Sequence, residues 1–255
     1  MENPKDLISI SIVSHKQASL VGALLEDILR YIDPQLIEII LTLNVPERHA
    51  SHVKNLRAST RIIENKGAKG FATNHNAAFK LARGDWFCVM NPDIRLMCNP
   101  FPPLLEELQS LGGAVIAPAV VGPTGLFEDN VRDFPTMRSL AAKLIWRMDG
   151  CHPGLLGNQA FFGDWVAGMF MLFRRDAFGS VGGFDEKFFL YYEDVDICAR
   201  LWRGGWSVVV FPGVQVIHHA RRTSRHHPGY MRWHLASMIR FFLKHHGHLP
   251  QRSHS

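Results

Sequence analysis

The chain has 255 residues, 47% of them hydrophobic and 20% charged, and a formal net charge of +5. This length and composition are typical of a folded protein with a core of its own and exclude an intrinsically disordered chain. No uncharged apolar run approaches the roughly 20 residues that a membrane-spanning helix needs. The four cysteines form no C-x-x-C pair, which favours free thiols in a reducing compartment. No secretory signal pattern is visible, so we expect a soluble or peripheral, cytoplasmic protein.

The charges are unevenly distributed along the chain. The first 196 residues carry 19 basic and 23 acidic side chains, whereas the remainder carries nine basic side chains and no acidic one. A chain with such a basic end is expected to meet an anionic partner there. Nucleic acid, a phosphorylated lipid and an anionic membrane surface each satisfy this requirement.

Periodicity predicts strands alternating with helices in the first half of the chain. Strands are predicted at residues 7–13, 36–43, 61–63 and 86–90, and helices at residues 20–31 and 71–82. This alternation is typical of right-handed βαβ units in a mainly parallel sheet. Because ligands bind at the carboxyl ends of such strands, we expect residues 14–16, 42–44 and 91–93 to lie along one crevice.

The segment Asn91-Pro92-Asp93 follows the last of these strands directly. A carboxylate at a strand end is placed to bind Mg²⁺, which takes one or two carboxylates together with substrate phosphates. The same three residues also form a common turn sequence without chemistry. The buried strand before the segment and an acidic cluster further along the chain favour the metal.

That acidic cluster puts three carboxylates, Glu193, Asp194 and Asp196, just before an apolar run at helical spacing. In the first turn of a helix, the dipole stabilises each negative charge by about 0.3–1 kcal/mol, so these residues can be capping acids only. The tight turn at residues 182–185 and the aromatic residues at 188–192 favour chemistry, since a carboxylate held at a rigid helix start suits a general base. Successive residues point about 100° apart, so we expect one acid to face a substrate.

The remaining segments are described by composition and periodicity. Residues 118–162 are rich in Gly and Pro, with a basic helical piece at 140–147, and are interpreted as a lid or an acceptor-side insertion. Strands are predicted at 206–211 and 214–217, and the second leads into His218-His219. A last helix is predicted at residues 230–246.

This last helix is predicted to be amphipathic. Its apolar stripe contains Met231, Leu235, Met238 and Phe242, and its basic face contains Arg232, Arg240 and Lys244. Such a helix suits docking on an anionic bilayer. Packing on the domain with a solvated basic side is the alternative.

The central block GGFDE-x-FF-x-YYEDVD-x-C-x-R, followed by Gly-Trp, a Pro and a His-His pair, resembles the inverting family 2 glycosyltransferases. The similarity is greatest to rhamnosyltransferase-type members that build cell-surface polysaccharides, and it runs from about residue 7 to about residue 247. It implies a single GT-A-like α/β domain at residues 1–228, with a nucleotide-binding half at about 1–98 and an acceptor-binding half at about 99–228. A basic amphipathic helix at 229–247 and a disordered tail at 248–255 complete the expected organisation.

The resemblance also implies roles for individual residues. Asp194 would be the general base, with Glu193 beside it, and Asp93 and His218 would bind the metal. The implied donor-binding residues are Ser14, His15, Lys69, Gly70, Asn76, Asn91 and Asp93. The implied acceptor-binding residues are Trp165, Gly168 and Tyr192, and the implied diphosphate-binding residues are Arg222, Ser224 and Arg225. Asp196 would then face elsewhere and serve as a first-turn acid.

Several of these roles have plainer alternatives. The segment at residues 67–76 can be a simple helix entry, His15 a satisfied strand-end histidine and Trp165 a core residue, while His218-His219 can be a surface pair. Two departures from the family pattern also matter. Asn91 replaces the first acid of the usual Asp-x-Asp motif, and Leu43 stands where an Asp commonly meets the donor base.

The resemblance thus predicts an inverting transferase that moves a sugar, best L-rhamnose from dTDP-rhamnose, to a hydroxyl of a cell-surface glycan or polyprenyl-diphosphate-linked oligosaccharide. The donor would be dTDP- or UDP-linked and the cofactor Mg²⁺ or Mn²⁺. We expect peripheral attachment to an anionic membrane surface, on the inner face of the cytoplasmic membrane, and no nucleic acid partner. A non-catalytic sugar-nucleotide or glycan-binding subunit and a sugar-phosphate nucleotidyltransferase are the alternatives. The sequence leaves the oligomeric state open.

Overall fold

The computed structural model describes residues 6–47, 58–136, 152–219, 228–245 and 248–250. The helices are α1 (Ala18–Tyr31), α2 (Phe71–Leu81), α3 (Phe101–Ser110), α5 (Arg175–Ser180), α6 (Glu193–Arg203) and α7 (Pro228–His245), with short 3-10 helices η1 (Pro34–Leu36) and η3 (Pro153–Leu156). The strands are β1 (Ile8–Ser14), β2 (Ile37–Leu43), β3 (Ser59–Glu64), β4 (Trp86–Met90), β5 (Ile94–Arg95), β6 (Val115–Val121), β7 (Val131–Arg132), β8 (Phe161–Phe162), β9 (Trp165–Val166), β10 (Phe170–Arg174) and β11 (Val208–His218).

A mixed sheet in the order β3-β2-β1-β4-β10-β6-β11-β5 forms the centre of the molecule. The pairs β2–β3, β1–β2, β1–β4 and β6–β11 are parallel, whereas β10 is antiparallel to both of its neighbours, β4 and β6. A separate small sheet pairs β7 with β9. The prediction of an α/β fold with a mainly parallel sheet is therefore confirmed.

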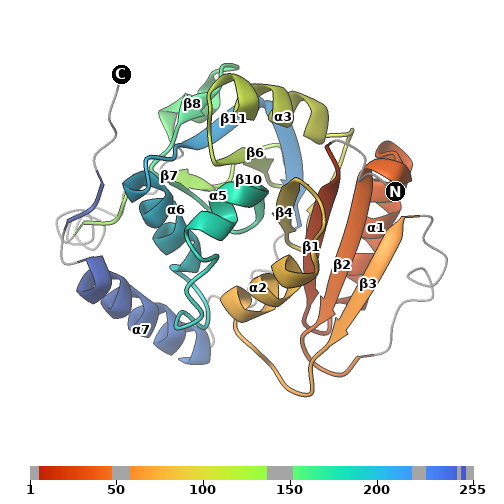
Figure 1. Ribbon diagram of the computed structural model, residues 1–255, viewed down its shortest axis with the longest axis horizontal. Helices are drawn as coiled ribbons and strands as arrows, with labels where there is room; N and C mark the ends of the chain where they lie inside the picture. The colour runs from red at the N-terminus through yellow and green to blue at the C-terminus, as the bar shows by residue number, and fades with distance from the viewer. Residues whose placement is uncertain (1–5, 48–57, 137–151, 220–227, 246–247, 251–255) are drawn as a thin grey trace.

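Helices cover both faces of the sheet (Figure 1). On one face, α1 and α3 bury an apolar stripe that includes Leu24, Ile28 and Leu104. On the other face, α2 packs on β1 and β2, α5 on β4 and β10, and α6 on β9 and β11, and Phe178 of α5 contacts four aromatic rings. Because both faces are covered, β2, β4 and β6 are buried at every position, and β4 and β6 are continuous apolar runs.

Two predictions about the second half of the chain are wrong. The segment that was expected to be irregular from residue 118 begins inside β6, which continues to Val121. Pro118 lies opposite Phe211, where the register of β11 shifts, so its missing N–H group disrupts little of the ladder. The strands predicted at 206–211 and 214–217 belong to the single strand β11, and the register shift, between Phe211 and Gln215, lies where the prediction divided it. The basic helical piece predicted at 140–147 lies outside the described residues.

The C-terminal helix α7 packs beside α6 at the outer edge of the molecule (Figure 1). The helix packs on the domain, but only part of the predicted apolar stripe is covered by this packing. Ser237, Phe241 and His245 are buried against the domain, while Met231 and Leu235 of the predicted apolar stripe are exposed. The predicted solvated basic face is also wrong for two of its three residues, because Arg240 and Lys244 form ion pairs with Asp185.

Candidate active site

The carboxyl ends of β1, β2 and β4 lie at one edge of the sheet, as predicted. The parallel registers bring Ser14 opposite Leu43 and Ile12 opposite Met90. A hydrogen bond of 2.8 Å from the Asn44 N–H to the Ser14 carbonyl continues this pairing beyond the strands. Ser14 is buried, His15 is exposed, and Leu43 is 5% exposed, so its side chain belongs to the core.

A network of asparagine side chains, missed by the sequence reading, fixes the loop between β3 and α2. The Asn44 amide donates to the Lys69 carbonyl (2.9 Å) and accepts from the Lys69 N–H (2.8 Å). Asn65 donates to both Asn44 (3.1 Å) and Asn74 (2.8 Å). These bonds hold the backbone at Lys69 while its side chain stays exposed at the strand-end edge.

Gly70 and Asn76 contact the loop before α6. A Cβ atom at Gly70 would lie 2.5 Å from the Phe189 carbonyl, which accepts a hydrogen bond from the Phe71 N–H. The Asn76 side chain donates to the Phe184 carbonyl (2.8 Å) and accepts from the Phe184 N–H (2.9 Å). Both residues thus tie α2 to the segment that carries the acidic cluster.

Two consecutive tyrosines before α6 have left-handed backbone conformations, with φ of +71° at Tyr191 and +66° at Tyr192. Such a conformation costs a non-glycine residue about 1–3 kcal/mol and persists only where surrounding contacts impose it. Here α7 supplies those contacts. Ser237 Oγ donates to the Leu190 carbonyl (2.8 Å), and the Tyr192 ring packs against His234 and Phe241.

This turn directs Asp194 toward the segment before β10. Asp194 Oδ2 accepts a hydrogen bond from the Gly168 N–H (3.0 Å), and Oδ1 accepts one from the Val195 N–H (2.9 Å). A Cβ atom at Gly168 would lie 2.8 Å from the Phe71 ring, so the glycine lets Phe71 pack closely on this segment. Burial raises the pKa of Asp194 despite these N–H donors. Such a carboxylate accepts a proton more readily than an exposed aspartate.

Glu193 lies beside it and is 4% exposed. Its Oε2 atom has no hydrogen-bond partner among the described residues. Burial and the neighbouring charge of Asp194 raise the pKa of Glu193 well above its usual range. Two adjacent acids that oppose each other's ionisation, near a positioned N–H donor, are typical of a reactive site rather than of helix capping.

Arg132 is the basic residue that acts on this site, and the sequence reading missed it. It lies in β7, opposite Trp165 of β9. Burial raises the pKa of Asp194 and of Tyr192, and the Arg132 charge offsets part of each rise. Burial and the Arg132 charge both lower the pKa of His234. Trp165 itself is half-buried and donates through its indole N–H to the Asp133 carbonyl (3.0 Å). The predicted diphosphate-binding residues Arg222, Ser224 and Arg225 lie outside the described residues.

Asp196 lies in the first turn of α6 and faces away from Asp194, as expected, but its contacts go beyond the helix dipole. Its side chain is fully buried and contacts three basic groups: Arg200 (2.8 Å), Lys244 (2.7 Å) and His245 (2.9 Å). Although burial raises it, the His245 hydrogen bond and the Arg200 and Lys244 charges together lower the pKa of Asp196 to about 2. Asp196 therefore joins α6 to α7.

At the strand-end edge, His218 lies between two carboxylates. Its Nε2 is 3.2 Å from Asp93 Oδ2, and its Nδ1 is 2.6 Å from Glu128 Oε2, a contact that the sequence reading missed. Although burial lowers it, these carboxylates raise the pKa of His218 overall. His219 contributes its backbone N–H to the Asp93 carbonyl (2.9 Å), so His218 is the histidine whose side chain meets Asp93.

These residues fit a divalent cation that is completed by substrate phosphates. Asp93 Oδ1 is buried and has no hydrogen-bond partner among the described residues. Within the same residues, no group of three or more His, Cys, Asp or Glu side chains is arranged to hold a metal ion. A site of Asp93 and His218 would therefore need oxygen ligands from the substrate, as Mg²⁺ commonly does.

One short segment links the strand-end edge to the acidic cluster. The Asn91 N–H donates to the Met169 carbonyl (2.9 Å), and the next residue back, Gly168, donates its N–H to Asp194. The Asn91-Pro92-Asp93 step and Asp194 thus lie against the same segment, residues 168–169. The structure thus places the strand end that carries Asp93 and the helix start that carries Asp194 against one segment, although these two residues are about 100 positions apart in the sequence.

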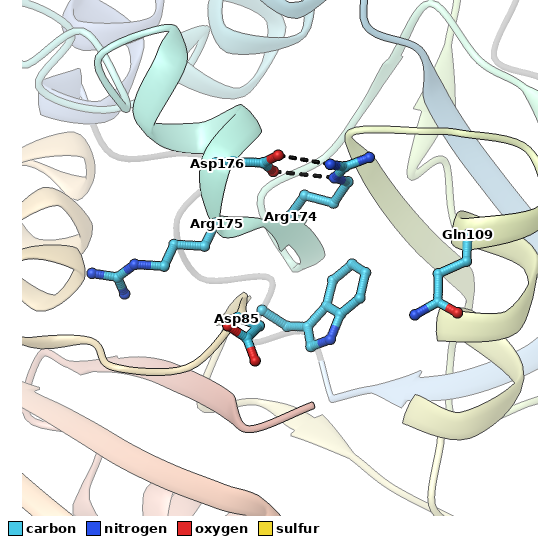
Figure 2. A pocket seen from close by; sticks show the side chains of 6 residues that line it. Asp85, Gln109, Arg174, Arg175 and Asp176 are labelled. Carbon is cyan, nitrogen blue, oxygen red and sulfur yellow. Dashed lines mark hydrogen bonds and ion pairs between the residues drawn. The ribbon is translucent and has the colours of Figure 1, made fainter. Parts of the chain in front are cut away.

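A hollow lies at the opposite edge of the sheet, where β4 begins and β10 ends. It is lined by residues that include Trp86, at the start of β4, and Arg174, at the end of β10. Figure 2 shows the Arg174 guanidinium paired with the Asp176 carboxylate, while Arg175 points away toward its own backbone partners. Arg174, Arg175 and Asp176 of this hollow thus have partners within the protein.

Comparisons with known proteins identify the family. Residues 9–182 match Glycosyl transferase family 2, and residues 130–244 match Glycosyl transferase family group 2. The chain belongs to glycosyltransferase family 2. The resemblance to this family that was read from the central block is therefore confirmed.

Two relatives are rhamnosyltransferases. The chain is 27% identical to the rhamnosyltransferase WbbL of Escherichia coli over 252 residues, which cover 93% of both chains. It is 31% identical to the N-acetylglucosaminyl-diphospho-decaprenol L-rhamnosyltransferase of Mycobacterium tuberculosis over 154 residues, which cover 56% of this chain. That match spans only about half the length of the M. tuberculosis protein (50%).

Solved structures confirm the GT-A fold. GalNAc-T7 with UDP, GalNAc and Mn²⁺ aligns over 95% of this chain and 48% of its own, with a TM-score of 0.71 at 14% identity. The mannosyltransferase PcManGT from Pyrobaculum calidifontis, with GDP-Man and Mn²⁺, aligns over 94% of this chain and 65% of its own, with a TM-score of 0.63 at 12% identity.

Proposed function

We propose that this glycosyltransferase moves L-rhamnose from dTDP-rhamnose to a hydroxyl of a lipid-linked or cell-surface glycan, with inversion. The observation that carries the proposal is the placement of Asp194. Its carboxylate is held at the start of α6 by the Gly168 N–H, against the same segment as the Asn91-Pro92-Asp93 strand end. A base and a diphosphate-binding edge in this relation suit attack by an acceptor hydroxyl on a nucleotide-sugar donor.

The reaction is a single displacement. The acceptor hydroxyl gives its proton to Asp194, its oxygen bonds to the anomeric carbon of the donor sugar, and the bond from that carbon to the diphosphate breaks. The electron pair leaves with the nucleoside diphosphate, so the anomeric configuration inverts. The raised pKa of Asp194 brings it closer to operating pH, which improves a general base.

The leaving diphosphate is the second charge that the site must accommodate. Asp93 and His218 would hold Mg²⁺ or Mn²⁺, and such an ion offsets the charge that develops on the departing phosphate. Ser14, His15, Lys69 and Asn91 lie at or beside the same sheet edge and would bind the rest of the donor. Because Leu43 is buried in the core, other groups would meet the donor base.

The acceptor would bind at Trp165, Gly168 and Tyr192. The proposed class of acceptor is supported by the M. tuberculosis relative, whose name states that it acts on N-acetylglucosaminyl-diphospho-decaprenol. A polyprenyl-diphosphate-linked acceptor would place the enzyme at the inner face of the cytoplasmic membrane. Among the described residues, no helix combines the length and apolar character needed to span a bilayer.

A donor screen tests the proposal. The purified chain is incubated with dTDP-rhamnose, UDP-linked sugars or GDP-mannose, with a lipid-linked diphosphate sugar as acceptor and Mg²⁺ or Mn²⁺, and released nucleoside diphosphate is measured. We expect release with dTDP-rhamnose, an inverted anomeric configuration in the product by NMR, and little release with Asp194→Asn. Turnover with another donor alone would refute the rhamnose assignment, and a retained configuration would refute the mechanism.

A further inference from the structure

Four large apolar side chains lie exposed along one side of α7. Met231, Leu235, Ile239 and Leu243 are spaced four residues apart and are 70%, 53%, 49% and 65% exposed, respectively. This spacing places them on one continuous strip, three turns long, which we call the α7 stripe. Scattered apolar residues are normal on a protein surface, but a contiguous exposed strip marks an interaction surface.

The opposite side of the helix is already occupied, so the α7 stripe cannot be buried by rotating the helix. Phe241 is fully buried, His245 contacts Asp196, and Ser237 donates to the Leu190 carbonyl. Arg240 and Lys244, the basic residues of this side, pair with Asp185 and lie over the Phe188 ring. The helix therefore presents its apolar side outward while its polar anchors point inward.

Aromatic residues lie near the start of α7, on the side of the helix that faces Phe189, because Trp233 is about 200° around the helix from Met231. Trp233 is 39% exposed and lies with its ring 4.9 Å from that of Phe189, which is itself 38% exposed. The Tyr230 ring packs edge-on against Trp233 at 5.4 Å. Trp and Tyr favour the boundary between water and the headgroups of a bilayer, where one end of the ring is apolar and the other is hydrated.

Charge decides between the occupants of this surface. No acidic residue follows Asp196 in the sequence, and Arg232 lies exposed beside the α7 stripe. A second copy of the chain, docked through the same strip about a two-fold axis, would bring the two Arg232 side chains toward each other with no acid of α7 to pair them, which is unfavourable. A bilayer with anionic headgroups is complementary to both the apolar strip and the positive charge.

We propose that α7 lies in the surface of an anionic bilayer, with the α7 stripe inserted among the lipids and its inner side carrying the catalytic loop. Since Ser237 and Phe241 contact Leu190 and Tyr192, docking would hold the acceptor side of the site at the membrane. The docking rests on the surface of α7 alone. Its use for a lipid-linked acceptor rests on the proposed function.

The test uses the full chain and vesicles of phosphatidylglycerol with phosphatidylcholine, separated by flotation. The variant Leu235→Gln/Ile239→Gln/Leu243→Gln removes the apolar strip at exposed positions, and Leu36→Gln/Leu156→Gln, at two other exposed leucines, is the matched control. We expect the wild type and the control to float, and the triple variant to lose at least about tenfold in partition. Raising salt from about 0.1 M to about 1 M shortens the Debye length from about 10 Å to about 3 Å, and should weaken but not abolish binding.

Three outcomes would overturn the docking proposal: no flotation of the wild type, equal flotation of the triple variant, or a concentration-dependent dimer that the triple variant loses. Nucleoside diphosphate release with a short water-soluble acceptor separates this failure from failure of the proposed function. We expect the triple variant to keep that activity and to lose activity only on vesicle-embedded acceptor. Vesicle binding without any donor turnover would refute the proposed function and leave the docking intact.

Discussion

Two groups of carboxylates on and around α6 behave in opposite ways. Glu193 and Asp194 form no ion pair among the described residues, and burial raises the pKa of both. Asp185 and Asp196 each contact at least two basic side chains. Burial opposes the effect, but these partners lower the pKa of both. We call the first pair the reactive acids and the second pair the anchoring acids.

The difference teaches that position in the sequence does not assign a role to an acid. Asp194 and Asp196 are two residues apart in one helical turn, so they leave the helix about 200° apart and meet different neighbours. Asp194 meets a backbone N–H group before β10, and Asp196 meets the side chains of α7. The first arrangement leaves a proton acceptor available, whereas the second uses the charge for stability.

The largest expected effect comes from Asp194→Asn. Removing the proton acceptor should lower the catalytic rate by about 10²–10⁴-fold, because general-base catalysis contributes about that much. The melting temperature should stay the same or rise, since a buried acid with a raised pKa destabilises the fold when it is ionised. Steady-state kinetics and thermal unfolding of the same sample check both points. A variant with wild-type turnover would contradict the base assignment.

The mirror experiment is Asp196→Asn. It should destabilise the fold by about 3 kcal/mol, because it leaves Arg200, Lys244 and His245 without their shared buried charge. Urea unfolding measures this difference, and donor affinity should change little. Asp176→Asn, which breaks an exposed pair with Arg174, is the control and should cost at most about 1 kcal/mol. If Asp196→Asn costs no more stability than Asp176→Asn, Asp196 is not an anchoring acid.

Glu128→Gln extends the comparison to the strand-end edge. Glu128 contacts the Nδ1 atom of His218, and we expect it to orient the imidazole toward Asp93. Loss of such an orienting carboxylate typically weakens metal binding by about 10–100-fold. Titration calorimetry with Mn²⁺ and a nucleoside diphosphate measures the affinity directly. Glu106→Gln, at an exposed position of α3, should leave it unchanged, and an unchanged affinity in Glu128→Gln would show that His218 needs no such partner.

The pH dependence separates the two groups within a single wild-type sample. Asp194 must be ionised to act, so the rate should fall with decreasing pH at a midpoint above 3.8, the ordinary aspartate pKa, because its folded pKa is raised. Asp196 has a lowered folded pKa of about 2, so its contribution is complete above 3.8 and is lost only as the pH falls from 3.8 toward 2. Activity should therefore disappear before the fold does. Rate measurements and near-UV circular dichroism over the same pH range check the order, and simultaneous loss would contradict it.

The sequence by itself determined the fold class, most of the sheet in the first half, and the family. Those features depend on local periodicity and on a motif of adjacent residues, which need no knowledge of long-range contacts. Strand β10 was not predicted, because its short apolar run is equally typical of a buried strand and of a buried helix. Glu128 and Arg132 were not predicted as site residues, because they lie in a segment without a regular pattern. Each of these gains its meaning only from a partner far along the chain, such as Glu128 from His218.

The orientation of α7 shows the same limit most clearly. Its periodicity indicated an amphipathic helix with an apolar side and a basic side, which left open whether the helix docks on a bilayer or packs on the domain. The tertiary structure decides which side is buried, because Asp185 and Asp196 of the domain attract Arg240, Lys244 and His245 and thereby turn Met231 and Leu235 outward. A helix sequence specifies which residues share a face, but the charges of the surface on which it packs select which face is buried.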